Sequence, residues 1–186
     1  GSPEPVRISP ILYPVINLLV RPISGIVSVF LLESVDATQA RILAGIILFP
    51  VFGALRNVFM FYVFRTMGCA FSWAVLASVL FAFGSSNFVY GSVPDSYGVS
   101  GMVLAALFLL TVQTIFTDRV VSIWKWIVIG TLSCGVLITH LFPLIITSFV
   151  AFLRKTGRLS KALWSSFFIA CASFSLTLVL HVSLYK

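Results

Sequence analysis

Few residues of this sequence can do chemistry, and Asp95 is the first of them. It is the only acid between Asp36 and Asp118, and it stands in a stretch, residues 83–101, that also carries four glycines and a proline. A carboxylate at a membrane surface can accept a proton, hold a divalent cation or pair with a cationic group. Capping of a helix beginning near Tyr97 explains the same carboxylate equally well, and the two roles are compatible.

Three further side chains belong with Asp95 as candidates, namely Tyr97, His140 and Arg41. The imidazole of His140 can bind a phosphate, ligate a metal or move a proton, although it can also be an ordinary interfacial histidine. The guanidinium of Arg41 suits a phosphate, and topological anchoring accounts for it equally well. Asp95 and His140 offer at most two ligands, so any divalent cation needs further ligands from the substrate or from elsewhere.

The composition says what kind of fold must position these residues. The chain has 186 residues, of which 60% are hydrophobic and only 9% are charged, and this is too apolar for a soluble domain. The net charge of +7 does not indicate a nucleic-acid partner, because the basic residues stand in short loops and form no stripe. The expected partner is the lipid bilayer.

Repeated apolar runs predict an all-α, polytopic integral membrane protein with about six transmembrane helices. The predicted spans are Gln39–Phe64, Cys69–Tyr90, Tyr97–Phe116, Ile123–Leu141, a return beginning at Leu144–Leu153, and Leu163–Leu184. His140-Leu-Phe-Pro143 is expected to form a turn, and Pro50 is expected to bend the first span.

The N-terminal region is predicted to differ from the rest. Pro10–Leu32 is apolar but is broken by Pro14, Arg21 and Pro22 into pieces too short to span a bilayer. Interfacial helices are therefore expected there, with a kinked spanning helix as the alternative. The predicted division is an outer-face segment at 1–38 and a transmembrane module at 39–186.

Loop charges predict the orientation. If the spans alternate, one side holds a single acid, Asp118, and the other side holds three acids, Glu33, Asp36 and Asp95, against Arg41. The basic residues of the first side are Arg65, Arg119, Lys125, Arg154, Lys155, Arg158 and Lys161. This side is expected in the cytoplasm. Asp95 and His140 are then expected on the periplasmic face of a bacterial inner membrane or the luminal face of the ER membrane.

Several site classes have no motif in this sequence. There is no GxSxG elbow, no HExxH pair and no phosphate loop ending in Gly-Lys-Ser/Thr. Two histidines without clustered thiols do not indicate zinc. Arg56 inside the first predicted span is a functional candidate, with snorkelling toward the Arg65 end as the alternative explanation.

The order of four short stretches resembles the membrane module of the GT-C glycosyltransferases, which use polyprenyl-phosphate sugars and include protein O-mannosyltransferases and aminoarabinose transferases. The stretches are Ser9-Pro10-Ile-Leu-Tyr-Pro14, Gln39-Ala-Arg41-Ile-Leu43, Phe88-Val-Tyr90-Gly-Ser-Val-Pro-Asp95-Ser-Tyr97 and Gly135-Val-Leu-Ile-Thr139-His140. They resemble, in turn, the family's entry into interfacial helices, its Arg-Leu helix start, its acidic tyrosine-containing loop and its Leu-Thr-His helix end.

The resemblance implies transfer of a sugar from a polyprenyl-phosphate donor to an acceptor on the non-cytoplasmic face. It implies that Asp95 is a catalytic carboxylate that holds a divalent cation in metal-using members, that Tyr97 lines the site and that His140 lies near the donor phosphate, with Arg41 as a second phosphate candidate. The family's base normally follows a first spanning helix, and Ser9 replaces the usual histidine. A fragment lacking that helix and that base is therefore expected.

Two other classes of function stay open on the sequence. A transporter or channel is the alternative to which Pro50 and Arg56 point. A membrane assembly subunit without a catalytic site is the other. The sugar, the acceptor and the oligomeric state are not predicted.

Overall fold

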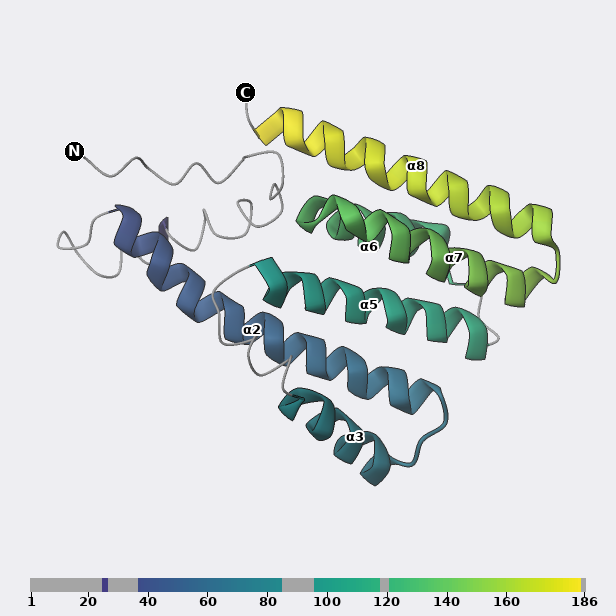
Figure 1. The fold of residues 1–186 in the computed structure, drawn as a ribbon, viewed down its shortest axis with the longest axis horizontal. Coiled ribbons are helices and arrows are strands. Elements are labelled where there is room, and N and C mark those ends of the chain that lie inside the picture. The colour runs from purple at the N-terminus through teal and green to yellow at the C-terminus, as the bar shows by residue number, and fades with distance from the viewer. Residues whose placement is uncertain (1–24, 27–36, 85–95, 118–120, 185–186) are drawn as a thin grey trace.

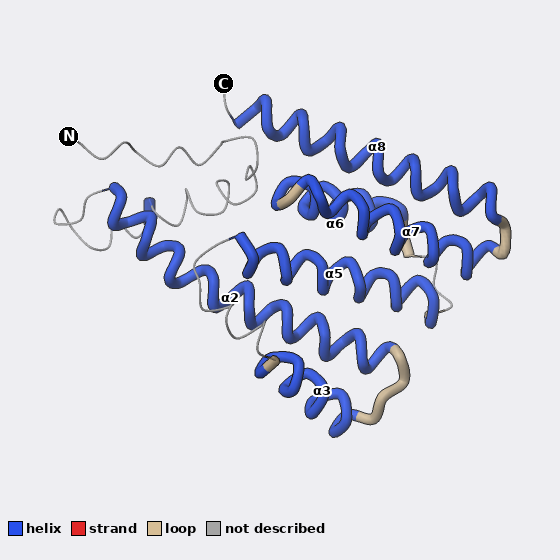
Figure 2. Tube along the Cα trace, viewed as in Figure 1, coloured by secondary structure: helices blue, strands red, loops and turns tan. Residues whose placement is uncertain are grey.

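The structure is a computed structural model that describes residues 25–26, 37–84, 96–117 and 121–184, and within these ranges every regular element is a helix (Figures 1 and 2). The elements are α2 (Ala37–Thr66), α3 (Phe71–Phe83), α5 (Ser96–Phe116), α6 (Ile123–Val136), the 3₁₀ helix η1 (Ile138–His140), α7 (Leu141–Thr156) and α8 (Leu159–Leu184). The all-α prediction is confirmed for this part of the chain.

Among the residues that the structure describes, three helical stretches are long and apolar enough to cross a membrane, namely Gly98–Phe116, Ile138–Thr156 and Leu159–Ser183. Large apolar side chains also cover the outside of the bundle; Trp73, Phe142 and Trp164 are 67%, 72% and 73% exposed. Such an apolar outer surface is a liability in water and is the expected surface in lipid. These features are those of a membrane protein, whereas the predicted number of about six spans is not confirmed.

Two predicted spans are shorter as helices than the apolar runs that predicted them. α3 has 13 residues and α6 has 14, so each is about 20 Å long against a hydrocarbon core of about 30 Å. α6 ends at Val136 because Leu137 adopts an extended backbone, with φ −148° and ψ 124°. The chain then makes one 3₁₀ turn and enters α7 directly.

Pro143 does not end a helix here, although it was expected to mark a turn. It is the third residue of α7, within the first helical turn, where the missing N–H of proline removes no intrahelical bond. The predicted turn therefore lies earlier, at Leu137–His140.

The N-terminal half of the described chain is dominated by α2, which is 30 residues long and runs without interruption through Pro50. Proline inside a helix removes a backbone bond and bends the axis, and the ribbon of α2 changes direction part-way along (Figure 1). Apart from a short helical piece at residues 25–26, the predicted interfacial helices lie outside the described residues.

The helices form a bundle with two chemically different ends. α5 packs against α2 on one side and against α6 and α7 on the other, α8 covers α6 and α7, and α3 packs on α2 (Figure 1). The cationic residues Arg65, Lys125, Arg154, Lys155, Arg158 and Lys161 lie where α2 and α7 end and where α6 and α8 begin. We call this the basic end. α5 begins and η1 lies at the opposite end.

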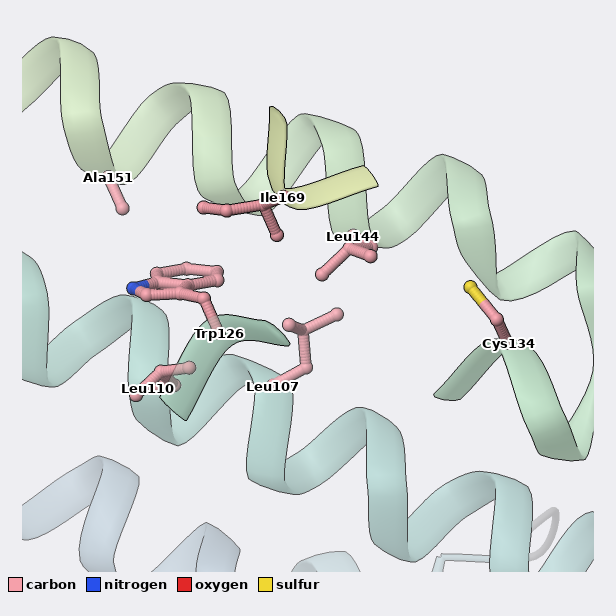
Figure 3. Packing of buried hydrophobic residues seen from close by; sticks show 7 residues of the cluster. All are labelled: Leu107, Leu110, Trp126, Cys134, Leu144, Ala151 and Ile169. Carbon is pink, nitrogen blue, oxygen red and sulfur yellow. The ribbon is translucent and has the colours of Figure 1, made fainter. Parts of the chain in front are cut away.

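The core is centred on Trp126, which is fully buried between α5 and the pair α7 and α8 (Figure 3). The neighbouring buried side chains are Leu107, Leu110, Cys134, Leu144, Ala151 and Ile169. Buried serine and threonine hydroxyls elsewhere in the bundle mostly donate to the carbonyl four residues earlier, as Thr111 does to Leu107. A helix thereby satisfies its polar side chains without water.

α6 and α8 approach each other closely at Gly130. A Cβ added to Gly130 would lie 2.3 Å from the Ser173 hydroxyl and 2.8 Å from Leu144 Cδ2, so a larger residue would force its neighbours to shift. Ser173 of α8 donates across this contact to the Ile127 carbonyl at 3.3 Å. The Thr177 hydroxyl lies 3.2 Å from the Thr131 carbonyl, and its shorter bond, at 2.8 Å, is to the Ser173 carbonyl of its own helix. Small residues and interhelical hydrogen bonds of this kind hold helices together in membranes. We call this contact the α6–α8 seam.

Candidate functional site

The side chain of His140 is buried where α5 begins. It belongs to η1, is only 6% exposed, and its Nε2 forms a 2.8 Å hydrogen bond with the hydroxyl of Ser100. Ser100 is the fifth residue of α5, so this bond joins two segments that are 40 residues apart.

The second nitrogen of His140 has no hydrogen-bond partner among the described residues. The Ser133 backbone lies close enough to the ring to interact with it, although Nδ1 makes no regular hydrogen bond there, and the Ser133 hydroxyl is itself buried without a partner. Buried polar atoms are nearly always paired, so unpaired ones call for an explanation such as a ligand. Polar groups held at membrane depth are costly and are usually functional.

Arg56 flanks the same turns of α5 from the other side. Its side chain is 7% exposed, and its Cδ and Nη1 lie 2.9 Å and 3.2 Å from where a Cβ on Gly101 would be. Its guanidinium carbon is 5.7 Å from the centre of the Phe81 ring, a cation–π distance. The arginine therefore points into the bundle between α2, α3 and α5. Snorkelling toward the Arg65 end is wrong for this side chain.

Several buried polar atoms have no partner among the described residues; one is Trp126 Nε1 in the core, and others lie near the start of α5. Arg56 Nε, Ser133 Oγ and His140 Nδ1 are all buried and unpaired within the described part of the chain, as is Asn57 Oδ1 next to Arg56. We call Arg56, Ser100, Ser133 and His140, which come from α2, α5, α6 and η1, the polar layer. It crosses the bundle at α5 residues 100–101.

The described residues contain no carboxylate side chain, because the five acids at positions 4, 33, 36, 95 and 118 all fall outside the ranges given above. The counter-charge of Arg56 is thus not among them. They also contain no group of three histidine, cysteine or acidic side chains that could hold a metal. A divalent cation would need Asp95 and oxygens of the substrate as ligands.

The structure brings only part of the predicted site into view. Asp95 lies outside the described residues, and α5 begins at Ser96, directly after it. Tyr97 is the second residue of α5 and Arg41 is the fifth residue of α2, but the side chains of both lie outside what is described. His140 is the one predicted site residue whose side chain is placed, and it lies against the helix that follows Asp95.

Ser100 and Ser133 were not anticipated from the sequence, and Arg56 was not connected with His140. One signal pointed to such a partner, since a histidine in an apolar segment needs a hydrogen-bonding group. Comparison with known proteins adds nothing further: no protein-family model, curated protein or solved structure matches this sequence.

The polar layer has the chemistry of an anion site. It combines a buried guanidinium, an imidazole and hydroxyl groups in a setting from which water is largely excluded. Hydrogen bonds and charges act more strongly in such a setting than in water. Arg56 Nε and His140 Nδ1 both lack a partner in the described residues, and each can donate a hydrogen bond to an anion oxygen.

Proposed function

We propose that this chain is the membrane module of a glycosyltransferase that takes its sugar from a polyprenyl-phosphate donor, at the end of the bundle opposite the basic end. The observation that carries the proposal is the buried hydrogen bond between His140 and Ser100, five residues after Asp95. The unpaired atoms of the polar layer support it, because the donor phosphate is an anion and needs such partners.

In the proposed reaction, an acceptor oxygen or nitrogen attacks the anomeric carbon of the sugar. A bond from that carbon to the acceptor forms, the bond to the phosphate oxygen breaks, and the lipid phosphate leaves with the electron pair. The acceptor proton passes to a carboxylate base, which the resemblance places after a first spanning helix and not at Asp95. A divalent cation held by Asp95 would add positive charge at the phosphate, and no step here depends on it.

The polar layer acts on the leaving group in this proposal. Arg56 and His140 stabilise the negative charge that develops on the phosphate. Gly101 allows the guanidinium to lie against α5, and Ser100 fixes the imidazole by holding Nε2, which leaves Nδ1 for the ligand. The proposed roles of Tyr97 and Arg41 are to line the sugar site and to bind the phosphate from the α2 side.

A binding measurement tests this proposal without requiring turnover. The protein is placed in lipid nanodiscs and titrated with a short-chain polyprenyl-phosphate sugar and with the matching polyprenol, which lacks the phosphate. We expect the phosphate compound to bind at least about tenfold more tightly, since a charge-assisted hydrogen bond contributes about 1.5–3 kcal/mol. His140→Gln and Arg56→Gln should each remove most of that difference, whereas Lys161→Ala at the basic end should not. Equal affinity for the two compounds would contradict the proposal.

A transporter remains the second candidate, on a specific observation. The break between α6 and α7 and the buried Arg56 are both features of carrier proteins whose helices are interrupted at a binding site. Binding of a small anion that depends on Arg56 but is unaffected by Asp95→Asn and by the polyprenyl chain would favour this function.

A further inference from the structure

An apolar groove of about 470 Å³ opens on the outside of the bundle between α2, α5 and α6. Phe59 of α2, the face of α5 from Met102 to Gln113, and the face of α6 from Trp124 to Leu132 line it. It is separate from the polar layer, whose residues do not contribute to its wall. We propose that this groove binds one acyl chain of an anionic phospholipid whose headgroup contacts Lys125.

The length of the groove fits a single leaflet. Along α5 it extends from Met102 to Gln113, eleven residues and thus about 16 Å. Half of the hydrocarbon core of a bilayer is about 15 Å thick. A phospholipid acyl chain lies within one leaflet, whereas a polyprenyl chain is not limited to that depth. The length of the groove therefore favours a phospholipid over a polyprenyl lipid.

The ends of the groove differ in charge, and this orients the lipid. Lys125 and Gln113 lie at the end where α6 begins, together with Trp124, which is 66% exposed. The other wall residues between these and Met102 are apolar. The ammonium of Lys125 complements a phosphate-bearing headgroup, and a tryptophan beside it is the usual residue at headgroup depth. Basic pockets between membrane helices bind anionic headgroups in this way.

Small side chains make room for the chain. Ala106 lies in the middle of the α5 wall and is only partly buried, so replacing it by phenylalanine fills the groove without entering the core. The proposal does not depend on the glycosyltransferase function, because none of the residues invoked belongs to the polar layer.

Trp124 offers a direct measurement, because bromine atoms on an acyl chain quench tryptophan fluorescence on contact. The protein is reconstituted in nanodiscs that contain increasing fractions of brominated phosphatidylglycerol or brominated phosphatidylcholine. The Trp124 signal is the difference between the protein and its Trp124→Phe variant. We expect half-maximal quenching at about a fivefold lower fraction of the anionic lipid than of phosphatidylcholine. One lysine near the membrane surface contributes about 1 kcal/mol to the binding of an anionic lipid, which corresponds to that factor.

Lys125→Ala should abolish this preference, and the control Lys161→Ala, at the same end of the bundle but on α8, should preserve it. Ala106→Phe should reduce quenching by both lipids while the circular dichroism spectrum stays unchanged. Equal quenching by the two lipids in the unmodified protein would overturn the proposal. So would a loss of preference of the same size in Lys161→Ala, or displacement of the brominated lipid by polyprenyl phosphate at lower concentrations than by phosphatidylglycerol.

Discussion

The α6–α8 seam and the polar layer both contain buried polar side chains, but these side chains differ in whether they have hydrogen-bond partners. At the seam, the hydroxyls of Ser173 and Thr177 both have backbone carbonyls as hydrogen-bond partners. In the polar layer, Arg56, Ser133 and His140 each keep a buried atom without a partner in the described chain. Polar groups that form hydrogen bonds stabilise the packing of helices. A buried polar group without a hydrogen bond lowers the stability of the fold, and a ligand that pairs with it restores that stability. The seam is therefore structural, and the polar layer is the candidate site.

The strongest test of the seam is Gly130→Ala. The new Cβ would lie 2.3 Å from the Ser173 hydroxyl and 2.8 Å from Leu144 Cδ2, so both side chains must rotate away or α8 must move. We expect the free energy of unfolding to fall by about 1–3 kcal/mol, which is the usual cost of adding a methyl group to a close-packed core. Gly53→Ala in α2 is the matched control, because nothing lies within 4 Å of its added Cβ. The free energy of unfolding of both variants is measured by titrating the protein, in mild detergent micelles, with a denaturing detergent. An equal loss of stability in Gly130→Ala and Gly53→Ala would mean that the seam is not close-packed.

The next effect in size concerns the polar layer itself. Ser100→Ala removes the hydrogen bond between α5 and the His140 ring, leaving Nε2 buried and unpaired. We expect a loss of about 1–2 kcal/mol in the free energy of unfolding. Ser175→Ala, an exposed position on α8, should change it little. In a His140→Phe background the loss should vanish, and a loss of unchanged size there would show that the two residues are not coupled.

Gly101→Ala tests the contact between Arg56 and α5. The added Cβ would meet Cδ of the arginine at 2.9 Å, and a flexible side chain can yield, so we expect a smaller cost of about 1 kcal/mol. The same substitution in an Arg56→Ala background should be neutral or stabilising, because alanine is the better helix former. The stability of the two variants is compared by the same detergent titration. A cost that persists without the arginine would place the close contact elsewhere.

The smallest expected effect belongs to a single hydroxyl of the seam. Thr177→Val removes, at nearly constant volume, the hydroxyl that lies 3.2 Å from the Thr131 carbonyl and 2.8 Å from the Ser173 carbonyl of its own helix. We expect the interhelical part of the loss to be at most about 0.6 kcal/mol, the average for hydrogen bonds between membrane helices. Thr66→Val is the control, since the Thr66 hydroxyl bonds only to the Tyr62 carbonyl of its own helix among the bonds described. A loss above that of the control supports the seam, and identical losses would argue against an interhelical contribution.

Hydropathy predicted some elements well and others poorly, for physical reasons. The predicted spans Tyr97–Phe116 and Leu163–Leu184 agree with α5 and with most of α8, because long apolar runs bounded by polar residues leave little choice. The end of α6 could not be predicted in the same way. The backbone breaks at Leu137, an apolar residue in an apolar run, and Pro143 is tolerated in the first turn of α7.

The candidate site was predicted only in part. His140 was identified from its residue type, but its partner Ser100 lies 40 residues away, and no local pattern encodes a contact of that range. The inward direction of the Arg56 side chain depends on Gly101 of another helix, so it could not be predicted from a local sequence pattern either. The predicted roles of Asp95, Tyr97 and Arg41 stay predictions, since those side chains lie outside the described residues.

The central claim is that the polar layer meets the phosphate of a lipid donor. A polyprenyl-phosphate sugar with a photoreactive diazirine on the isoprene unit next to the phosphate tests it most directly, by mass spectrometry of the labelled peptides. We expect labels on the first turns of α5 around Ser100 and on residues 138–141, and we expect them to disappear with excess unlabelled donor. Labels confined to the basic end, or to the groove beside Trp124, would contradict the claim.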